Sequence, residues 1–359
     1  MLAGFTLAAP YVSSALKQGF SLLSSLTTGQ GTTTSSDTTS TPTLFSTHTV
    51  NVTCAGVVSV GNLLAPDIKN RSARITYPSD YCALASNVLT VINGDRSANG
   101  TTPVTLDYNQ ASQQHADSML YYGYFSHYDT QGLKPYMRYT LLGGTASDFE
   151  NVAFLQYSVD HFTSTQAVED GLKTLERSMV YNDSSCCNNG HRYNILNPLR
   201  NKVSIGVAYD AKNLYFDEEF ENNYVALNFN ATGKSSPNPY YITMTGVPTQ
   251  QITSPDAIYI AFDSTPTAET ISQLESGPHE YGPGTLLGGV LPSNGLGCGQ
   301  FQKGITVCAD RWTFRSSGME IAFSMNEFVK NSGPGVYTIY LIAGPDTNSA
   351  ITTISVFVQ

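Results

Sequence analysis

The stretch that decides the fold begins DYNQASQQHADSMLYYGYFSH (residues 107–127), continues through SDFENVAF (147–154) and ends in NNGHRYNIL (188–196). Three ionisable side chains in it, His127, Glu150 and His191, lie among small, aromatic and amide residues. Two imidazoles and a carboxylate can bind zinc or a similar divalent ion, and they can equally act as a general base and acid. The alternative is three hydrogen-bonded polar residues near helix ends, because sequence separation alone does not bring them together.

The composition narrows the class of protein. The 359 residues are enough for two or three domains. Charged residues make up only 13% of the chain, and the net charge is −10 with no run of Lys or Arg. Nucleic acid is therefore excluded as a partner, since phosphate neutralisation needs clustered cations. The surface is instead rich in neutral hydrogen-bonding groups, which favours association.

Cysteines and glycosylation sequons indicate an extracellular or cell-surface protein. The even number of cysteines suits disulfides in an oxidising compartment. Short separation favours pairing Cys298 with Cys308 and Cys54 with Cys82, leaving Cys186 and Cys187 as an adjacent disulfide or two thiols. Six reduced, buried thiols remain the alternative. The candidate glycosylation sites are Asn51, Asn70, Asn99, Asn182 and Asn230.

The N-terminal part reads as a helix followed by a stalk. Residues 1–26 are apolar, but Pro10 and Lys17 interrupt the run and no basic residue precedes it. A signal, a membrane anchor and a helix that packs between subunits all remain open. Residues 27–45 are a Thr/Ser-rich linker, and residues 46–80 are a connecting segment with a strand around Val50.

Periodicity predicts an α+β fold in the middle of the chain. Helical spacing is evident from about Tyr81 and again over residues 109–122 and 166–180. Residues 202–210 and 214–221 then read as a returning pair of strands. We expect residues 81–230 to form one mixed α and β domain.

The last third of the chain predicts a different architecture. Residues 231–239 form a Gly/Ser/Pro linker. Short alternating strands with turn signals between them fill residues 240–359, which indicates an antiparallel, immunoglobulin-like β-sandwich. No catalytic grouping is evident there, and His279 and Glu280 read as solvated surface.

Residues 87–221 resemble the CAP superfamily of cysteine-rich secretory, antigen 5 and pathogenesis-related proteins, in its prokaryotic SCP-like branch. The matching motifs occur in the family's order: Asn93-Gly-Asp-Arg96, Gln114-His115-Ala116-Asp117, Tyr124-Phe125-Ser126-His127, Asp129-Thr130-Gln131-Gly132 with Pro135-Tyr136-Met137-Arg138, Glu150-Asn151-Val152-Ala153, and Gly190-His191-Arg192-Tyr193-Asn194-Ile195-Leu196. The resemblance implies an α-β-α sandwich with a cleft lined by two histidines and up to two acidic residues.

The motif match places His127, Glu150 and His191 in that cleft. Glu176 is the candidate for the fourth place, with Ser178 as its alternative, and the cleft would hold Zn or another divalent metal. Residues 179–189 read as an insertion beside it.

Other matched positions are expected to be structural. His115 corresponds to a position that packs a helix. Arg96, Arg138 and Asn151 are expected to fix turns, form ion pairs and cap backbone groups. Phe149 stands where the family has Gly, which would narrow the cleft.

Three functions follow from these expectations. The first is an extracellular or cell-surface binding or adhesion module that recognises an unknown ligand, lipid or glycan. The second is a structural subunit of a filament, surface layer or virion, which self-assembles through strand exchange and residues 1–26, with membrane contact through the same segment. The third, a hydrolase in which Glu150 activates water on a metal, is less favoured, because fold resemblance is a weak warrant for an enzyme.

Overall fold

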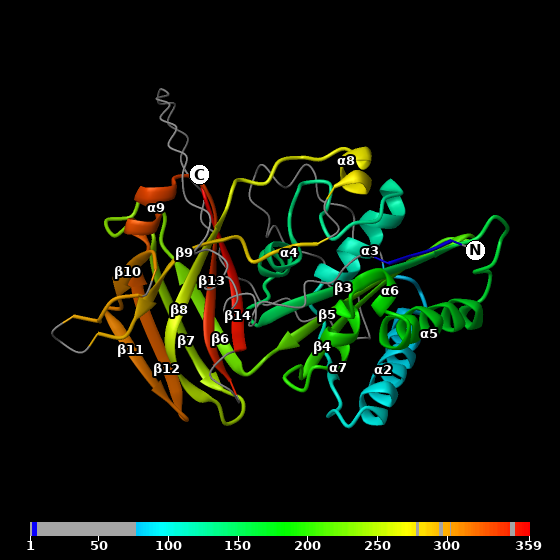
Figure 1. Ribbon diagram of the computed structural model, residues 1–359, viewed down its shortest axis with the longest axis horizontal. Coiled ribbons are helices and arrows are strands. Elements are labelled where there is room, and N and C mark those ends of the chain that lie inside the picture. Colours follow the sequence, from blue (N-terminus) through cyan, green and yellow to red (C-terminus); the bar gives the residue numbers. More distant parts are fainter. Residues whose placement is uncertain (1, 6–76, 278–279, 294–296, 302, 345–348) are drawn as a thin grey trace.

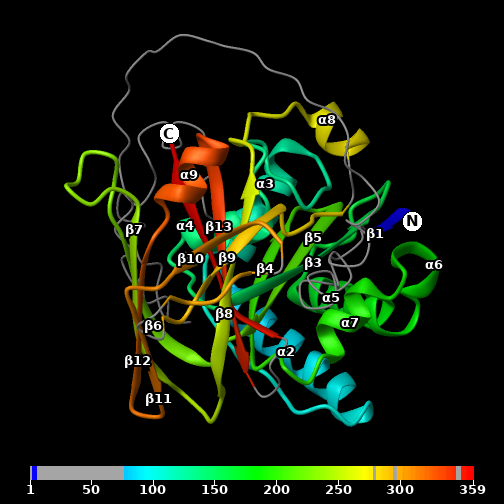
Figure 2. The ribbon, with the colours of Figure 1, turned by 60° about the vertical axis from the view of Figure 1, so that its left-hand side comes forward.

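The computed structural model describes residues 2–5, 77–277, 280–293, 297–301, 303–344 and 349–359. Over these residues the protein is a mixed α and β fold with three sheets (Figure 1). The first sheet belongs to a helix-covered layer, and the other two pack as a sandwich beside it (Figure 2).

The first sheet has the strand order β1-β3-β5-β4-β2. Its strands are β1 (Leu2–Phe5), β2 (Thr105–Leu106), β3 (Ser147–Gln156), β4 (Lys202–Tyr209) and β5 (Asn213–Asn222). The pairs among β1, β3, β5 and β4 are antiparallel, whereas β2 runs parallel to β4. The predicted strands at 202–210 and 214–221 are thus confirmed.

Helices cover both faces of this sheet. On one side lie α3 (Ala111–Tyr122) and α4 (Pro135–Leu141), and on the other lie α2 (Tyr81–Ala98), α5 (Thr165–Tyr181) and α7 (Gly190–Leu196), with the short α6 (Ser184–Cys187) before it. The helices predicted near Tyr81, at 109–122 and at 166–180 correspond to α2, α3 and α5. This is the α-β-α layering that the resemblance implied.

Strand alternation gives the two faces different chemistry. On β4 and β5, Val203, Ile205, Phe216 and Phe220 point toward α2 and α5 and form the apolar core there. The residues between them, including Gly206 on β4 and Asp217, Glu219 and Glu221 on β5, point toward α3 and α4. The α3–α4 face is therefore the polar one.

Two further sheets pack face to face around a second apolar core. One has the order β10-β9-β8-β13-β14 and the other β11-β12-β7-β6. Their strands are β6 (Val225–Ala231), β7 (Tyr241–Pro248), β8 (Thr253–Asp263), β9 (Thr285–Leu291), β10 (Ile305–Cys308), β11 (Arg311–Arg315), β12 (Gly318–Ser324), β13 (Gly335–Gly344) and β14 (Ser349–Val358). Two short helices, α8 (Ile271–Ser276) and α9 (Asn326–Ser332), lie in the connections.

The sandwich departs from the prediction at two places. β10 pairs with β9 in parallel, so an entirely antiparallel sandwich was wrong at this pair. β6, which falls inside the range expected for the first domain, pairs with β7 in the sandwich.

β14 joins the sandwich to the helix-covered layer. Ser147 and Thr353 hydroxyls lie 2.8 Å apart, and Asn222 Nδ2 donates to the Ala350 carbonyl at 2.8 Å. The long connection after β8 also crosses to the first layer, where Leu274 of α8 packs with Met119 and Tyr124.

The N-terminal expectations are tested at only four residues. Leu2–Phe5 is a strand at the edge of β3 and not the start of the predicted helix. The rest of 1–26, the linker 27–45 and the strand around Val50 lie outside the described residues. Among the described residues, no helix is long and apolar enough to span a bilayer.

Candidate functional site

His127 and Glu150 form a buried pair on the polar face of the first sheet. Gly123 ends α3 with a left-handed conformation (φ 70°), and the chain then turns toward β3. His127 Nδ1 lies 2.7 Å from Glu150 Oε1, and both side chains are fully buried. Tyr281, from the loop after α8, packs its ring edge against His127 and accepts a hydrogen bond from the Glu150 amide at 2.9 Å.

Arg138 of α4 binds the other carboxylate oxygen of Glu150. It also donates to the carbonyls of His127 and Leu133, at 2.9 Å each. Burial alone would raise the pKa of Glu150, but Arg138 and His115 outweigh it and hold this pKa well below its usual value. Glu150 is therefore an ionised carboxylate neutralised by a buried guanidinium.

His115 of α3 completes this cluster. Its Nδ1 lies 3.2 Å from Glu150 Oε2 and 2.9 Å from Asp217 Oδ2. Burial, with Arg138 nearby, lowers its pKa to about 4. His115 was expected only to pack a helix. Its ring also contacts the carboxylates of Glu150 and Asp217.

A row of buried acids continues from this cluster along the sheet. Asp148 lies opposite Glu221, and Glu150 lies opposite Glu219 in the β3–β5 pairing. All four are buried. Like charges at opposed positions repel, and burial together with the neighbouring carboxylates raises the pKa values of Asp148, Glu219 and Glu221 well above normal. The site therefore favours the neutral form of these three acids and the ionised form of Glu150.

Glu176 lies on the other face of the sheet. It projects from α5 beside Glu218 of β5, whose neighbour on β3 is Asn151. Burial and Glu218 raise the pKa of Glu176 well above normal, and burial raises the pKa of Glu218 to about 7. Asn151 Nδ2 donates to Glu218 at 3.3 Å and to the His191 carbonyl at 3.4 Å, and the second of these bonds caps a backbone group as expected.

His191 pairs with an acid that the sequence did not single out. Its Nδ1 lies 2.6 Å from Asp183 Oδ1, and both side chains are fully buried. The other carboxylate oxygen of Asp183 accepts from the Arg192 amide at 3.0 Å. α7 lies along β3, where Asn194 donates to the Asn151 side chain at 3.0 Å.

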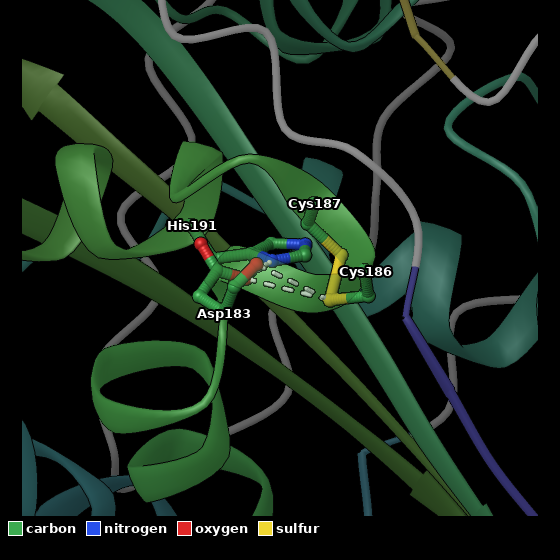
Figure 3. A group of neighbouring side chains, drawn as sticks. All are labelled: Asp183, Cys186, Cys187 and His191. Carbon is green, nitrogen blue, oxygen red and sulfur yellow. Dashed lines mark hydrogen bonds and ion pairs between the residues drawn. A yellow bond between two sulfur atoms is a disulfide. The ribbon is translucent and has the colours of Figure 1, made fainter.

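The adjacent cysteines form a disulfide beside this pair. Cys186 and Cys187, left open as a disulfide or two thiols, are joined in the structure (Figure 3). The predicted disulfide between Cys298 and Cys308 is confirmed. Cys54 lies outside the described residues, so its pairing with Cys82 stays a prediction.

The expected glycosylation sites are accessible where they are described. Asn99, Asn182 and Asn230 are all exposed. Asn51 and Asn70 lie outside the described residues. Modification of these side chains stays a prediction.

Two groups of candidate metal ligands occur among the described residues. One is His115, Glu150 and Asp217, and the other is Asp183, Cys186, Cys187 and His191. The first group does not fit a divalent ion, because the Arg138 guanidinium already contacts both Glu150 and His115. A second cation there would repel Arg138 in a site without solvent.

The predicted set of His127, Glu150, His191 and Glu176 divides into separate neighbourhoods. Glu150 and Asn151 are successive residues on β3 and so point to opposite faces of the sheet. His127 and Glu150 meet on the α3–α4 face, while Glu176 and the helix of His191 pack on the other. In this arrangement the four residues do not fit a single metal ion, and their shared cleft stays a prediction.

The sequence did not indicate several residues that contact or lie near the predicted site residues. Asp217 and Glu219 stand on a strand that was predicted correctly, and their alternation could have placed them with Glu150. Tyr281 belongs to a Gly/Pro-rich loop with no comparable signal. Asp183 stood in the segment interpreted as an insertion.

Comparison with known proteins bears on part of the chain. No curated protein matches the sequence. Residues 89–229 match the model of the cysteine-rich secretory protein family, CAP, whose members are generally extracellular. The match begins within α2 and runs through β5 into β6, and this segment of the chain belongs to the CAP superfamily.

Proposed function

We propose that this protein is an extracellular or cell-surface binding module that uses its CAP segment to hold a small amphipathic ligand. The observation that carries the proposal is a groove of about 270 Å³ between α2 and α5. Its α2 side is formed by Leu84, Asn87, Val88 and Val91, and its α5 side by Gln166, Glu169, Asp170 and Lys173.

The two sides of this groove suit one class of ligand. Three apolar side chains and one amide line the α2 wall, while an amide and three charged groups line the α5 wall. Binding sites commonly combine an apolar surface with a few polar groups that fix orientation. The volume falls below the usual range of roughly 300–1,000 Å³, so the groove would take one acyl chain or ring system and leave the rest of the ligand outside. A lipid fits this better than a glycan, because no aromatic ring lines the groove.

A fluorescent fatty acid titrated into the full chain tests the proposal. We expect saturable binding that Val91→Glu weakens at least tenfold, because the new carboxylate would lie against the apolar part of the ligand. Val159→Glu is the matched control, since Val159 is 66% exposed and lies outside the groove. Absence of binding to the wild-type protein, or equal loss in both variants, would overturn the proposal.

The hydrolase alternative finds little support in the geometry. A carboxylate that activates water needs access to that water. Glu150 is fully buried, and Arg138, His115 and His127 contact its two oxygens. Turnover of an ester or peptide library that Glu150→Gln abolishes would nevertheless establish this activity.

Strand exchange between subunits is a second proposal with its own observation. β1 adds to the edge of the first sheet by pairing antiparallel with β3, from Leu2 opposite Gln156 to Phe5 opposite Ala153. Addition of a distant terminal strand to a sheet edge is also the way in which subunits are linked by exchange. Deleting residues 1–45 should then convert an assembled protein into a monomer in size-exclusion chromatography, and persistent assembly would argue against it.

A further inference from the structure

The loop from α5 to α7 gathers four side chains that can bind a metal. Asp183 precedes α6, Cys186 and Cys187 end it, and His191 lies in the first turn of α7. Asn188 and Asn189 both have left-handed backbone conformations, with φ of 49° and 63°. This sharp reversal folds α7 back onto α6, so that the four side chains converge (Figure 3).

The distances suit a single ion. One ligand atom from each of the four residues can be chosen so that all lie within 4.8 Å of one another. Cys186 Sγ lies 3.7 Å from Asp183 Oδ1, and His191 Nδ1 lies 2.6 Å from the same oxygen. Ligand atoms of a tetrahedral zinc lie roughly 3.3–3.8 Å apart, given Zn–S of about 2.3 Å and Zn–N of about 2.0 Å. Small side-chain rotations would therefore suffice.

The surroundings also suit a metal. Asp183, Cys187 and His191 are buried, whereas Cys186 is exposed and leaves a way in from solvent. The nearby Arg192 guanidinium is directed elsewhere, to the Val180 carbonyl and the Asn99 side chain.

The oxidation state decides whether the sulfurs can bind. The thiolate is the metal ligand, and the sulfurs of a disulfide carry no such charge. We propose that Asp183, Cys186, Cys187 and His191 form a binding site for a soft divalent cation such as Zn²⁺ or Cd²⁺, closed while the adjacent cysteines are joined and opened when they are reduced. Thiolate sulfur selects such cations over Mg²⁺ and Ca²⁺.

The opening step is an ordinary thiol–disulfide exchange. A thiolate of an external dithiol attacks the exposed Cys186 sulfur, the S–S bond breaks, and Cys187 leaves as a thiolate. The second thiol of the reductant then displaces Cys186 and departs as a cyclic disulfide. Two electrons and two protons have passed from the dithiol to the cysteines, and a divalent cation that binds afterwards releases both protons.

This site is independent of the groove between α2 and α5 and of strand exchange. It also differs from the predicted cleft, because Asp183 and the two cysteines take the places of His127, Glu150 and Glu176. His191 alone is common to both sets.

Cadmium titration of the full chain tests the proposal. A trialkylphosphine reduces the disulfides, taking up an oxygen from water and leaving two thiols at each, and it is removed before Cd²⁺ is added. We expect the reduced protein to bind one more equivalent of Cd²⁺ than the Cys186→Ser/Cys187→Ser variant, read from the thiolate-to-cadmium absorption band. The oxidised protein should show no such band from these residues.

Two matched controls locate the site. Cys298→Ser/Cys308→Ser removes the other disulfide of the described chain and should keep the extra equivalent. Asp183→Asn should weaken Cd²⁺ binding by about 10- to 100-fold while leaving the number of thiols unchanged. Reduced wild-type protein alkylated with iodoacetamide serves in place of the double Ser variant if that variant does not fold.

The outcomes are distinct. Equal Cd²⁺ uptake by the reduced wild type and the Cys186→Ser/Cys187→Ser variant would overturn the proposal, as would uptake that does not depend on reduction. If the reduced Asp183→Asn variant binds Cd²⁺ with the affinity of the wild type, as read from the thiolate-to-cadmium band, Asp183 is not part of the site. Fatty-acid binding should be the same with and without Cd²⁺.

Discussion

Arg138 binds the carboxylate of Glu150 inside the protein, where 1% of the arginine side chain and none of the glutamate side chain are exposed. One residue comes from a helix on the polar face and the other from the strand beneath it. The contact ties α4 to β3 and fixes Glu150 as the ionised member of a row of acids.

Replacing Arg138 by Met should destabilise the protein by about 3–5 kcal/mol, because it leaves a buried carboxylate unpaired. Urea unfolding followed by circular dichroism measures this change. The double variant Arg138→Met/Glu150→Gln should recover part of the loss, since no uncompensated charge remains. Arg311→Met is the control, because the Arg311–Glu320 pair is largely exposed, and it should leave the unfolding midpoint unchanged. Equal effects of both substitutions would contradict this account.

The buried acids make stability depend on pH in an unusual direction. Asp148, Glu176 and Glu219 have folded-state pKa values well above their ordinary 3.8 or 4.5, and that of Glu218 rises to about 7. The folded state then binds more protons than the unfolded chain between about pH 4 and the raised pKa values. Stability is full below that window and is lost as the pH rises through it. The melting temperature should therefore be higher near pH 5 than near pH 8.

His115 acts against this trend, because its folded-state pKa of about 4 lies below the ordinary 6.5. It costs stability as the pH falls between those values, and several acids outweigh one histidine. Above pH 4.5 the free energy of unfolding should fall less steeply in the Glu218→Gln variant, by on the order of 3 kcal/mol in all. A melting temperature that rises from pH 5 to pH 8 would show that these acids are ionised in the folded protein.

Gly206 allows α3 to lie directly on β4. A Cβ atom at this position would come within 2.1 Å of the Ser112 carbonyl oxygen and 2.8 Å of the Gln113 amide nitrogen. Gly206→Ala should therefore cost about 1–3 kcal/mol, because the α3 backbone must move.

Gly94→Ala is the matched substitution. Gly94 lies within α2, and a Cβ atom added there would meet no other atom within 4 Å, so its replacement should stabilise by about 0.5–1 kcal/mol. Thermal unfolding of the two variants checks the contrast. Similar effects at both positions would mean that α3 does not lie this close to the sheet.

Asp263 connects the sandwich to the CAP segment. Its carboxylate accepts from Lys134 at 2.7 Å and from the Tyr136 hydroxyl at 2.8 Å, and the Lys134 and Asp263 side chains are 14% and 15% exposed. Asp263→Ala should cost about 2 kcal/mol, as hydrogen bonds to a partly buried charge are lost. Asp256→Ala, at an exposed position of the same strand, should change little. Equal losses of unfolding free energy in the two variants, measured by urea unfolding, would refute this connection.

The sequence predicted the elements far better than their contacts. Apolar spacing in residues such as Leu84, Val88 and Ile92 is enough to place α2, because all three lie in the core that the helix covers. The ordered motifs likewise predicted the CAP segment that the family comparison confirms. These signals are local or ordered along the chain, so one sequence carries them.

Partners across the fold were harder to foresee. His191 pairs with Asp183, eight positions away, because Asn188 and Asn189 reverse the chain between them, and the sequence did not indicate this pairing. Left-handed backbone at two successive asparagines has no periodic signal. The parallel pairing of β9 and β10 was also missed, since alternation predicts a strand but not its direction.

The last strand carries a consequence for how the protein is made. β14 is buried on both sides, and its Thr353 amide donates to Ala146, more than two hundred positions earlier in the chain. A ribosome makes this strand long after the residues that it covers. The CAP segment would thus emerge early, as N-terminal units do, and wait with the Ser147 and Asn222 surfaces uncovered. A nascent chain stalled before Ser349 should recruit chaperones that the released protein no longer needs.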